Sequence, residues 1–255
     1  ERYMVSEDAS EITLEPGIVG ARVNAILKPY GRKFGPDPAS IGSCMVGGIV
    51  MNNASGMSCG THANSDKELE SVRMVFADGT VLDTGDETSR EAFRAGHPEF
   101  IKGIEELRDG ILADKELSER IRYKYSIKNV TGLNIFPFIR FEDPFDIIAH
   151  LLVGSEGTLG VMTKATFSIF KIPEKRIFRG FLFKKLGDGI AAGRDMLQDI
   201  KPSIIRLYDE AETVSIIKNI IGVAKPGVFM NIAVEGRDDM AELEMKIACD
   251  IAAKY

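Results

Sequence analysis

Three glycine-rich segments contain the residues best suited to chemistry. They read GPDPASIGS (35–43), GGIVMNNASG (47–56) and GSEGTLG (154–160). Glycine lets a ligand come close to backbone N–H groups, and successive amides can form a nest for phosphate oxygens. Short hydroxyl donors lie in the same segments: Ser40, Ser43, Ser55 and Thr158. Lysine and arginine are absent from residues 34–66. We therefore expect backbone amides to contact the anion, as suits a dinucleotide diphosphate.

The three segments differ from two common phosphate-binding motifs. A P-loop is excluded because no Gly-Lys-Ser/Thr follows any of them, and the GxGxxG fingerprint of NAD-type Rossmann domains is absent. Taken singly, each segment could instead serve turns and close strand packing. The occurrence of three in one stretch of chain favours a ligand site.

Histidine and cysteine offer little further chemistry. His62, His97 and His150 are isolated, and no carboxylate spacing accompanies them, so we expect no metal site. His62 is expected to cap a turn, with a position facing a bound ligand as the alternative. His97 is expected to be solvated and His150 to lie in the core. The three cysteines have no CxxC spacing, which argues against a zinc site or a disulfide framework.

Arg206 stands out in the apolar segment SIIRLYD. If that segment is a buried strand, an unpaired guanidinium would be costly. Arg206 is therefore expected either to pair with Asp209 or Glu210, or to face a substrate carboxylate.

The composition sets the class of protein. The chain has 255 residues, of which 44% are hydrophobic and 27% charged, enough for one large or two small domains. A net charge of −6 argues against nucleic-acid binding. No apolar run reaches the ~18 residues that span a bilayer, and no signal peptide opens the chain. These features favour a reducing, cytoplasmic setting.

The patterning predicts mixed helix and strand. We expect a strand at 10–15, a helix at 18–28, a long ordered loop at 34–65 and a hairpin at 70–86 with a type I′ turn at Asp78-Gly79. A helical stretch follows over about 88–122, with Phe100, Ile104, Leu107 and Ile111 on one stripe. A short helix lies near 146–152 and leads into GSEGTLG and a strand that ends at Pro173.

The pattern of the sequence changes after residue 175. Strands and helices alternate without glycine loops, which indicates a separate α+β layer of ferredoxin-like type. The last helix is expected to bury Met240, Leu243, Ile247 and Ile251. We place the domains at 1–173 and 174–255.

The segments GPDPASIGSCMVGGIVMNNASGMSCGTHANSDKELESVRMVFADGTVLDT and LLVGSEGTLGVMTKATFSI resemble the FAD-linked oxidases with the vanillyl-alcohol-oxidase-type fold. YSIKNVTGLNIFPF and FEDPFDIIAHLLVGSEGTLG are similar to the D-lactate, glycolate and D-2-hydroxyglutarate dehydrogenase branch. KPSIIRLYDEAET is similar to the substrate or cap domain, including that of alkyl-dihydroxyacetone-phosphate synthases. The resemblance covers nearly the whole chain.

The fold class implied is α+β: a PCMH-type FAD-binding domain lacking its N-terminal part, followed by part of a ferredoxin-like substrate/cap domain. The family's upstream phosphate loop and its downstream histidine motifs have no match here, so the chain resembles an internal fragment. The catalytic residues, including the base, are accordingly unassigned.

The resemblance also implies which residues contact FAD. In such proteins the segment matching 39–43 wraps the diphosphate and ribityl region, Gly47 and Gly48 admit the cofactor, and 52–56 lie beside the flavin. The segment matching 156–161 meets the adenosine end. The implied cofactor contacts are Pro38, Ala39, Ser40, Ile41, Gly42, Ser43, Gly47, Gly48, Asn52, Asn53, Ala54, Ser55, Gly56, Glu156, Gly157, Thr158, Leu159, Gly160 and Val161. Arg206 is the implied substrate contact. Cys59, beside the flavin segment, is expected to be a packing residue, with covalent flavin attachment as the alternative.

The implied function is oxidation of a D-2-hydroxy acid by hydride transfer to flavin. Electrons would then pass to a quinone, cytochrome, electron-transfer flavoprotein or iron–sulfur partner, with the protein cytoplasmic or peripheral to a membrane. Two alternatives stay open: a flavin transferase like alkyl-dihydroxyacetone-phosphate synthase, and a non-catalytic nucleotide-binding module.

Overall fold

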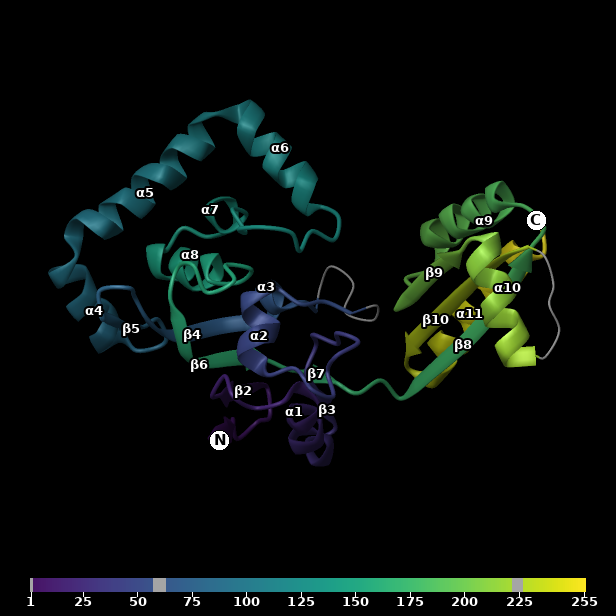
Figure 1. The fold of residues 1–255 in the computed structure, drawn as a ribbon, viewed down its shortest axis with the longest axis horizontal. Helices are drawn as coiled ribbons and strands as arrows, with labels where there is room; N and C mark the ends of the chain where they lie inside the picture. Colours follow the sequence, from purple (N-terminus) through teal and green to yellow (C-terminus); the bar gives the residue numbers. More distant parts are fainter. Residues whose placement is uncertain (1, 57–62, 222–226) are drawn as a thin grey trace. The chain divides into compact units, whose positions relative to one another are not determined.

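A five-stranded antiparallel sheet organises the first part of the chain (Figure 1). Its strand order is β1-β2-β6-β4-β5, so β6 lies between β2 and β4 although it comes last in sequence. The strands are β1 (Tyr3–Val5), β2 (Glu11–Leu14), β4 (Leu69–Val75), β5 (Val81–Asp83) and β6 (Val161–Ser168). The pairing of Val75 with Val161 places the end of the GSEGTLG segment beside the end of β4.

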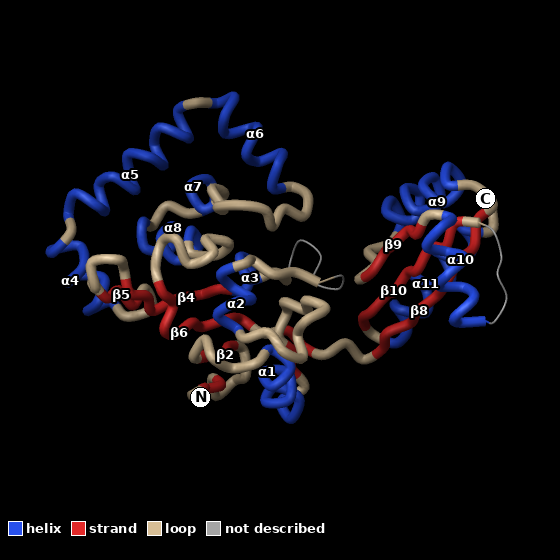
Figure 2. The backbone as a smooth tube through the Cα atoms, in the orientation of Figure 1, coloured by secondary structure: helices blue, strands red, loops and turns tan. Residues whose placement is uncertain are grey.

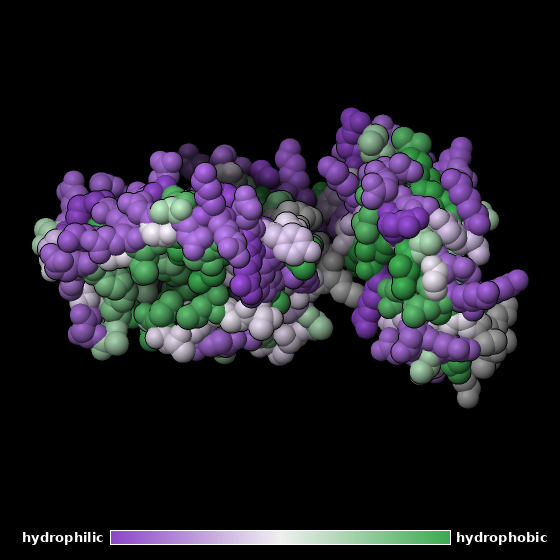
Figure 3. All heavy atoms as spheres, turned by 90° about the horizontal axis from the view of Figure 1, so that it is seen from above, coloured by the Kyte–Doolittle hydropathy of each residue, from purple (hydrophilic) through white to green (hydrophobic). Residues whose placement is uncertain are grey.

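This computed structural model describes residues 2–56, 63–221 and 227–255. The chain divides into two compact units, Glu1–Lys171 and Ile172–Tyr255. Each unit has its own hydrophobic core. Hydrophobic side chains also remain on the surface of both units, where they appear green in Figure 3. Leu107, Tyr123 and Phe178 are among the exposed hydrophobic residues.

Some helices of the first unit lie against its sheet, and others lie farther out (Figure 2). The helices are α1 (Gly20–Leu27), α2 (Val46–Met51), α3 (Ser65–Glu68), α4 (Glu87–Gly96), α5 (Pro98–Ala113), α6 (Lys115–Tyr125), α7 (Pro137–Arg140) and α8 (Pro144–Leu151), with a 3-10 turn at Lys28–Tyr30. Among them, α4 and α8 lie against the sheet, and α5 and α6 lie farther out. A two-stranded ribbon joins β3 (Arg32–Lys33) to β7 (Phe170–Lys171). Ile147 of α8 and Ile49 of α2 join Ile12 and Phe167 of the sheet in one core.

Two expectations for this unit were wrong in detail. The stretch 34–65 is not loop throughout, because α2 lies within it and α3 begins at its last residue. The β4–β5 hairpin forms, but its turn is not type I′, which needs positive φ at two successive residues. Only Gly79 has positive φ here (87°), and Phe76 pairs with Thr80 around a three-residue loop.

The second unit is a three-stranded antiparallel sheet with helices (Figure 1). Its elements are β8 (Lys175–Phe183), α9 (Leu186–Asp199), β9 (Ile204–Tyr208), α10 (Glu210–Ile221), β10 (Val228–Gly236) and α11 (Asp238–Ala252). The strand order is β8-β10-β9, so α9 connects two strands that flank β10, the split β-α-β arrangement of ferredoxin-like folds. Met196 of α9 and Met245 of α11 pack against Met230 and Ile232 of β10. The α+β class is thus confirmed.

The buried stripe of α11 differs from the predicted one. Met240 and Leu243 are exposed, whereas Ala241, Met245 and Ala248 are buried with Ile251. Alanine at the contact lets the helix come close to the sheet, so the inner face combines small residues with Met245 and Ile251.

Candidate functional site

The second and third glycine-rich segments meet at the C-terminal end of α2. The N–H of Gly154 donates to the carbonyl of Val50 (3.1 Å), and the N–H of Glu156 donates to the carbonyl of Met51 (2.9 Å). Ser155 also directs its hydroxyl at the Met51 sulfur, 3.5 Å away. Both carbonyls belong to the last turn of α2, where a helix leaves carbonyls without intrahelical partners, and the Val50 carbonyl also accepts the N–H of Asn53 (2.9 Å). Residues 50–53 and 154–156 therefore form one structural element.

The first segment joins the same assembly. Gly56 lies against Asp37 so closely that a Cβ on Gly56 would be 1.8 Å from the Asp37 carbonyl oxygen. On the other side, Ala21 of α1 donates its N–H to the carbonyl of Ile41 (2.9 Å), and Gly20 donates to Cys44 (3.0 Å). All three glycine-rich segments are thus neighbours in space.

The helix α2 forms despite its two glycines because one side of it is deeply buried. Val46, Ile49 and Val50 are each at most 1% exposed. The opposite side carries Gly48, which is exposed. Amphipathic burial therefore overrides the low helix propensity of the Gly-Gly pair.

The glycines of the three segments fall into two groups. Most of them have a local reason to be glycine: Gly35, Gly47, Gly56 and Gly160 are crowded by neighbouring atoms, and Gly154 and Gly157 have positive φ. Gly42 and Gly48 have neither reason, because a Cβ on either would meet open space. Glycine inside a helix costs about 1 kcal/mol relative to alanine, so Gly48 is unfavourable for α2 by itself.

The other predicted contacts differ in their exposure. Ala39, Ser40, Ser43, Asn52, Glu156, Thr158 and Leu159 are exposed, and Pro38 and Asn53 are buried. Ile41, Ala54, Ser55, Gly56 and Gly160 are half-buried. Asn53 and Glu156 both adopt positive φ, 48° and 52°. Asparagine tolerates this backbone conformation better than most residues. Val161 begins β6 as expected and is 64% exposed.

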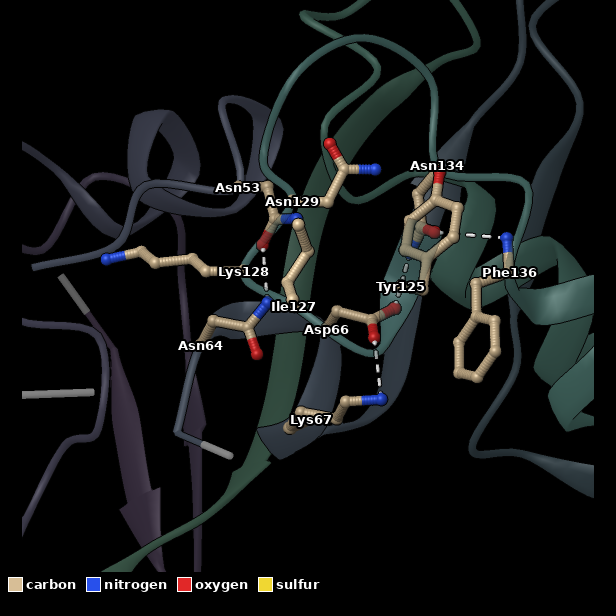
Figure 4. Close-up of a pocket in the computed structure, with 10 residues that line it drawn as sticks. All are labelled: Asn53, Asn64, Asp66, Lys67, Tyr125, Ile127, Lys128, Asn129, Asn134 and Phe136. Atoms are coloured by element: carbon tan, nitrogen blue, oxygen red, sulfur yellow. Dashed lines mark hydrogen bonds and ion pairs between the residues drawn. The ribbon is translucent and has the colours of Figure 1, made fainter. Parts of the chain in front are cut away.

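A polar pocket lies beside Asn53 (Figure 4). Asn64 donates to the Asn53 side-chain oxygen (3.2 Å), and Asn134 donates to Asp66 (2.6 Å). Tyr125 stacks on Phe136 with centroids 5.3 Å apart, and burial raises the pKa of the Tyr125 hydroxyl. The pocket joins the NNASG segment to residues 125–136, the segment YSIKNVTGLNIF.

Sequence reasoning assigned only Asn53 among the residues of this pocket. The amides Asn64, Asn129 and Asn134 were missed, although the pair of asparagines in KNVTGLN was a usable signal. The Oδ1 of Asn64 and the Nδ2 of Asn129 are buried and lack hydrogen-bond partners among the described residues. Unsatisfied buried polar atoms of this kind indicate a site completed by another molecule, such as a bound water or ligand.

The remaining single-residue predictions have mixed outcomes. His150 is buried, 3% exposed, with its Nδ1 2.8 Å from the Asp146 carbonyl; burial lowers its pKa, so it is a neutral core histidine. His97 is half-buried and packs on Phe93, which corrects the solvated position expected for it. Cys59 and His62 lie outside the described residues.

Arg206 requires a correction. It is exposed on β9, with its guanidinium over the Tyr208 ring at 4.5 Å. The argument from the cost of a buried charge therefore does not apply to it.

Comparisons with known proteins agree with this geometry. Residues 2–85 match the family described as FAD binding domain. These residues belong to the FAD-binding domain of the FAD-linked oxidases. The cofactor of this domain is FAD, which suits glycines that leave room for a ligand near their backbone.

The curated proteins that this chain resembles have two different activities. The chain is 25% identical over 177 residues to D-2-hydroxyglutarate dehydrogenase of Haemophilus influenzae, covering 65% of this chain and 16% of that protein. It is also 25% identical over 209 residues to alkyldihydroxyacetonephosphate synthase of Dictyostelium discoideum, covering 81% of this chain and 26% of that protein. The chain therefore spans about a quarter or less of the length of these two curated relatives.

A solved structure of an alkyldihydroxyacetonephosphate synthase shares the fold. The TM-score is 0.63 at 19% identity, with 98% of this chain and 39% of that chain covered. The PCMH-type flavoprotein fold expected from the sequence is confirmed. Within the described residues no helix is both long and apolar enough to cross a bilayer.

Proposed function

We propose that this chain is part of an FAD-dependent dehydrogenase that oxidises a D-2-hydroxy acid. The observation that carries the proposal is the meeting of three glycine-rich segments around α2, with open space in front of Gly42 and Gly48. Its substrate class is supported by the relation to D-2-hydroxyglutarate dehydrogenase. When bound, FAD supplies the hydride acceptor for such an oxidation.

The chain's own residues would bind and orient the cofactor. Pro38–Ser43 would offer backbone amides to the diphosphate, and Gly48 would let the cofactor come close to α2. Asn52–Gly56 would lie beside the flavin and its phosphates, and Glu156–Val161 would hold the adenosine end. In this arrangement the hydrogen bonds from Gly154 and Glu156 to α2 keep the two ends of the site at a fixed separation.

The substrate contact proposed for this chain is Arg206. A guanidinium can form two parallel hydrogen bonds to a carboxylate, the group that every 2-hydroxy acid carries. Arg206 is exposed on β9, and the Tyr208 ring supports its guanidinium. A base must also remove the hydroxyl proton, and we assign that role to no residue of this chain.

A second candidate function has a specific observation behind it. The relation to alkyldihydroxyacetonephosphate synthase covers more of this chain, 81% against 65%, and a structure of that activity shares the fold. Such an enzyme would use the same FAD site without net oxidation of its substrate.

The visible spectrum of the full-length protein tests the proposal. We expect the absorbance bands of oxidised flavin, bleached under anaerobic conditions by D-lactate, D-2-hydroxyglutarate or glycolate, with L-lactate as the control. A yellow protein that none of these acids bleaches, and that forms an alkyl-dihydroxyacetone phosphate, would establish the second candidate. A colourless protein that takes up no FAD on reconstitution would contradict both.

A further inference from the structure

Glu68 is an ionisable side chain buried between elements of the first unit. It is the last residue of α3, directly before β4, and its exposed fraction is 0%. Its backbone carbonyl accepts a hydrogen bond from the Ser168 hydroxyl of β6 (3.3 Å). A carboxyl group this deep in a protein needs partners, because burial without them is costly.

One oxygen of Glu68 has such a partner. The N–H of Gly35 donates to Oε2 at 3.0 Å, a contact between residues 33 positions apart. The other oxygen, Oε1, has no hydrogen-bond partner among the described residues. The hydrogen bond to Gly35 is therefore the polar contact that holds the Glu68 carboxyl group in place.

The Glu68 carboxyl group lies so close to Gly35 that it leaves no room for a side chain there. A Cβ on Gly35 would lie 1.5 Å from Glu68 Oε1 and 2.7 Å from the Ala63 carbonyl oxygen. Positive φ does not explain this glycine, since its φ lies outside that region. Gly35 is glycine because the Glu68 carboxyl occupies the position of its side chain.

The bond lies where the chain enters the first glycine-rich segment. Just before it, the N–H of Phe34 donates to the Asn24 side chain (2.9 Å), and the Phe34 ring packs edge-on against Phe167. Just after it come Pro38–Ser43, the segment proposed to hold the FAD diphosphate. Glu68 thus ties the start of that segment to the central strands of the sheet.

Burial also determines the charge of this group. Desolvation raises the pKa of Glu68 to about 9, although the Gly35 N–H and the charge of Lys33 act in the opposite direction. At neutral pH the carboxyl is protonated and can still accept from Gly35 through its carbonyl oxygen. A glutamine would keep that acceptor and the shape.

We propose that Glu68 is a positioning residue that fixes Gly35 and thereby sets the 35–43 segment in the conformation that receives the FAD diphosphate. The inference rests on the proposed FAD site in this segment. It assigns Glu68 no contact with the cofactor.

The test is FAD affinity of the full-length protein, measured by quenching of flavin fluorescence on binding. Glu68→Gln should bind FAD within about threefold of wild type, because it retains the acceptor for Gly35. Glu68→Met, similar in size but without an acceptor, should raise the FAD Kd about tenfold, the effect of losing one hydrogen bond. Glu70→Gln, on the exposed neighbour in β4, is the matched control and should bind as wild type.

Hydrogen exchange of the Gly35 amide measures directly whether its hydrogen bond to Glu68 persists in solution. This second measurement can be made on the wild type and needs no destabilised variant. In wild type and Glu68→Gln we expect this amide to exchange slowly. Fast exchange in the folded wild type, or an unchanged FAD Kd in folded Glu68→Met, would overturn the inference. Failure of the wild type to bind FAD would instead contradict the proposed function, and slow exchange at Gly35 would still support the tie between Glu68 and this segment.

Discussion

The backbone N–H of Gly154 donates to the carbonyl of Val50 at 3.1 Å, which joins two glycine-rich segments that lie far apart in the sequence. The neighbouring bond from Glu156 to Met51 extends this contact by one more residue on each side. Because both carbonyls belong to the last turn of α2, any movement of the 154–160 segment would also disturb this helix end. The two proposed halves of the FAD site are therefore mechanically coupled.

Gly154→Ala tests this coupling. Gly154 has φ of +81°, and a Cβ there would lie 3.2 Å from the Gly132 carbonyl oxygen. We expect the substitution to lower the free energy of unfolding by about 1–3 kcal/mol, the usual cost of a strained backbone conformation, and to weaken FAD binding. Urea denaturation and FAD titration would measure the two effects.

Gly110→Ala is the matched control for that substitution. Gly110 lies in α5, and a Cβ on it would meet nothing within 4 Å, so alanine should raise stability by about 1 kcal/mol. FAD affinity should not change. Equal loss of stability in both variants would argue against strain at position 154.

Gly48→Ala separates stability from binding. In α2 alanine is the better helix former, and the space in front of Gly48 is open, so the apoprotein should gain up to about 1 kcal/mol in the free energy of unfolding. If the cofactor occupies that space, the added methyl group should raise the FAD Kd at least tenfold. The apoprotein melting temperature and an FAD titration are the two measurements. A variant that is more stable and binds FAD as well as wild type would contradict the placement of FAD at α2.

The sequence predicted the helices between 88 and 122 only as one stretch. Two breaks divide it: Pro98 opens α5 directly after His97, and Asp114 caps α6 by accepting the N–H of Leu117 at 3.0 Å. These are local signals that a reading based on periodicity overlooks. The assumed continuous stripe also failed, since Ile101 and Ile104 are buried while Phe100 and Leu107 are exposed.

The site shows a different limit of sequence reasoning. Glycine type and spacing located the segments, but they could not distinguish Gly47, which packs on Pro16, from Gly48, which faces open space. That difference depends on which side of α2 is buried, a tertiary property. Likewise, the pairing of Glu68 with Gly35 depends on α3 and the 35–43 segment being neighbours, and nothing in the sequence around Glu68 indicates that it contacts this segment.

Glu68 also predicts a pH dependence of stability. In the unfolded chain this carboxyl ionises near pH 4.5, whereas in the fold it keeps its proton up to a pKa of about 9. The folded state therefore binds more protons between these values, and the free energy of unfolding falls as pH rises. The full contribution is present below pH 4.5 and is lost as pH rises through about 9.

Glu68→Gln should remove this dependence. The variant should gain stability over wild type as pH rises from 5.5 to 8, by about 3 kcal/mol if the group titrates alone, since each pH unit corresponds to about 1.4 kcal/mol. Urea denaturation at the two pH values gives the difference, and Glu70→Gln should leave it unchanged. If the stability difference between Glu68→Gln and wild type stays constant across this range, Glu68 is ionised in the folded protein.

Arg206→Gln tests the proposed substrate contact. Arg206 is exposed on β9 with its guanidinium over the Tyr208 ring, and substitutions at exposed positions usually change stability little, so the melting temperature should stay close to that of wild type. If its guanidinium binds the carboxylate of a 2-hydroxy acid, KM for the acid that bleaches the flavin should rise about tenfold or more, the value of a charged hydrogen bond. The control is Arg194→Gln, an exposed arginine of α9 that pairs with Asp195 at 2.7 Å and should leave KM unchanged. Equal KM values for Arg206→Gln and wild type would remove Arg206 from the substrate site, leaving the FAD site of the first unit unaffected.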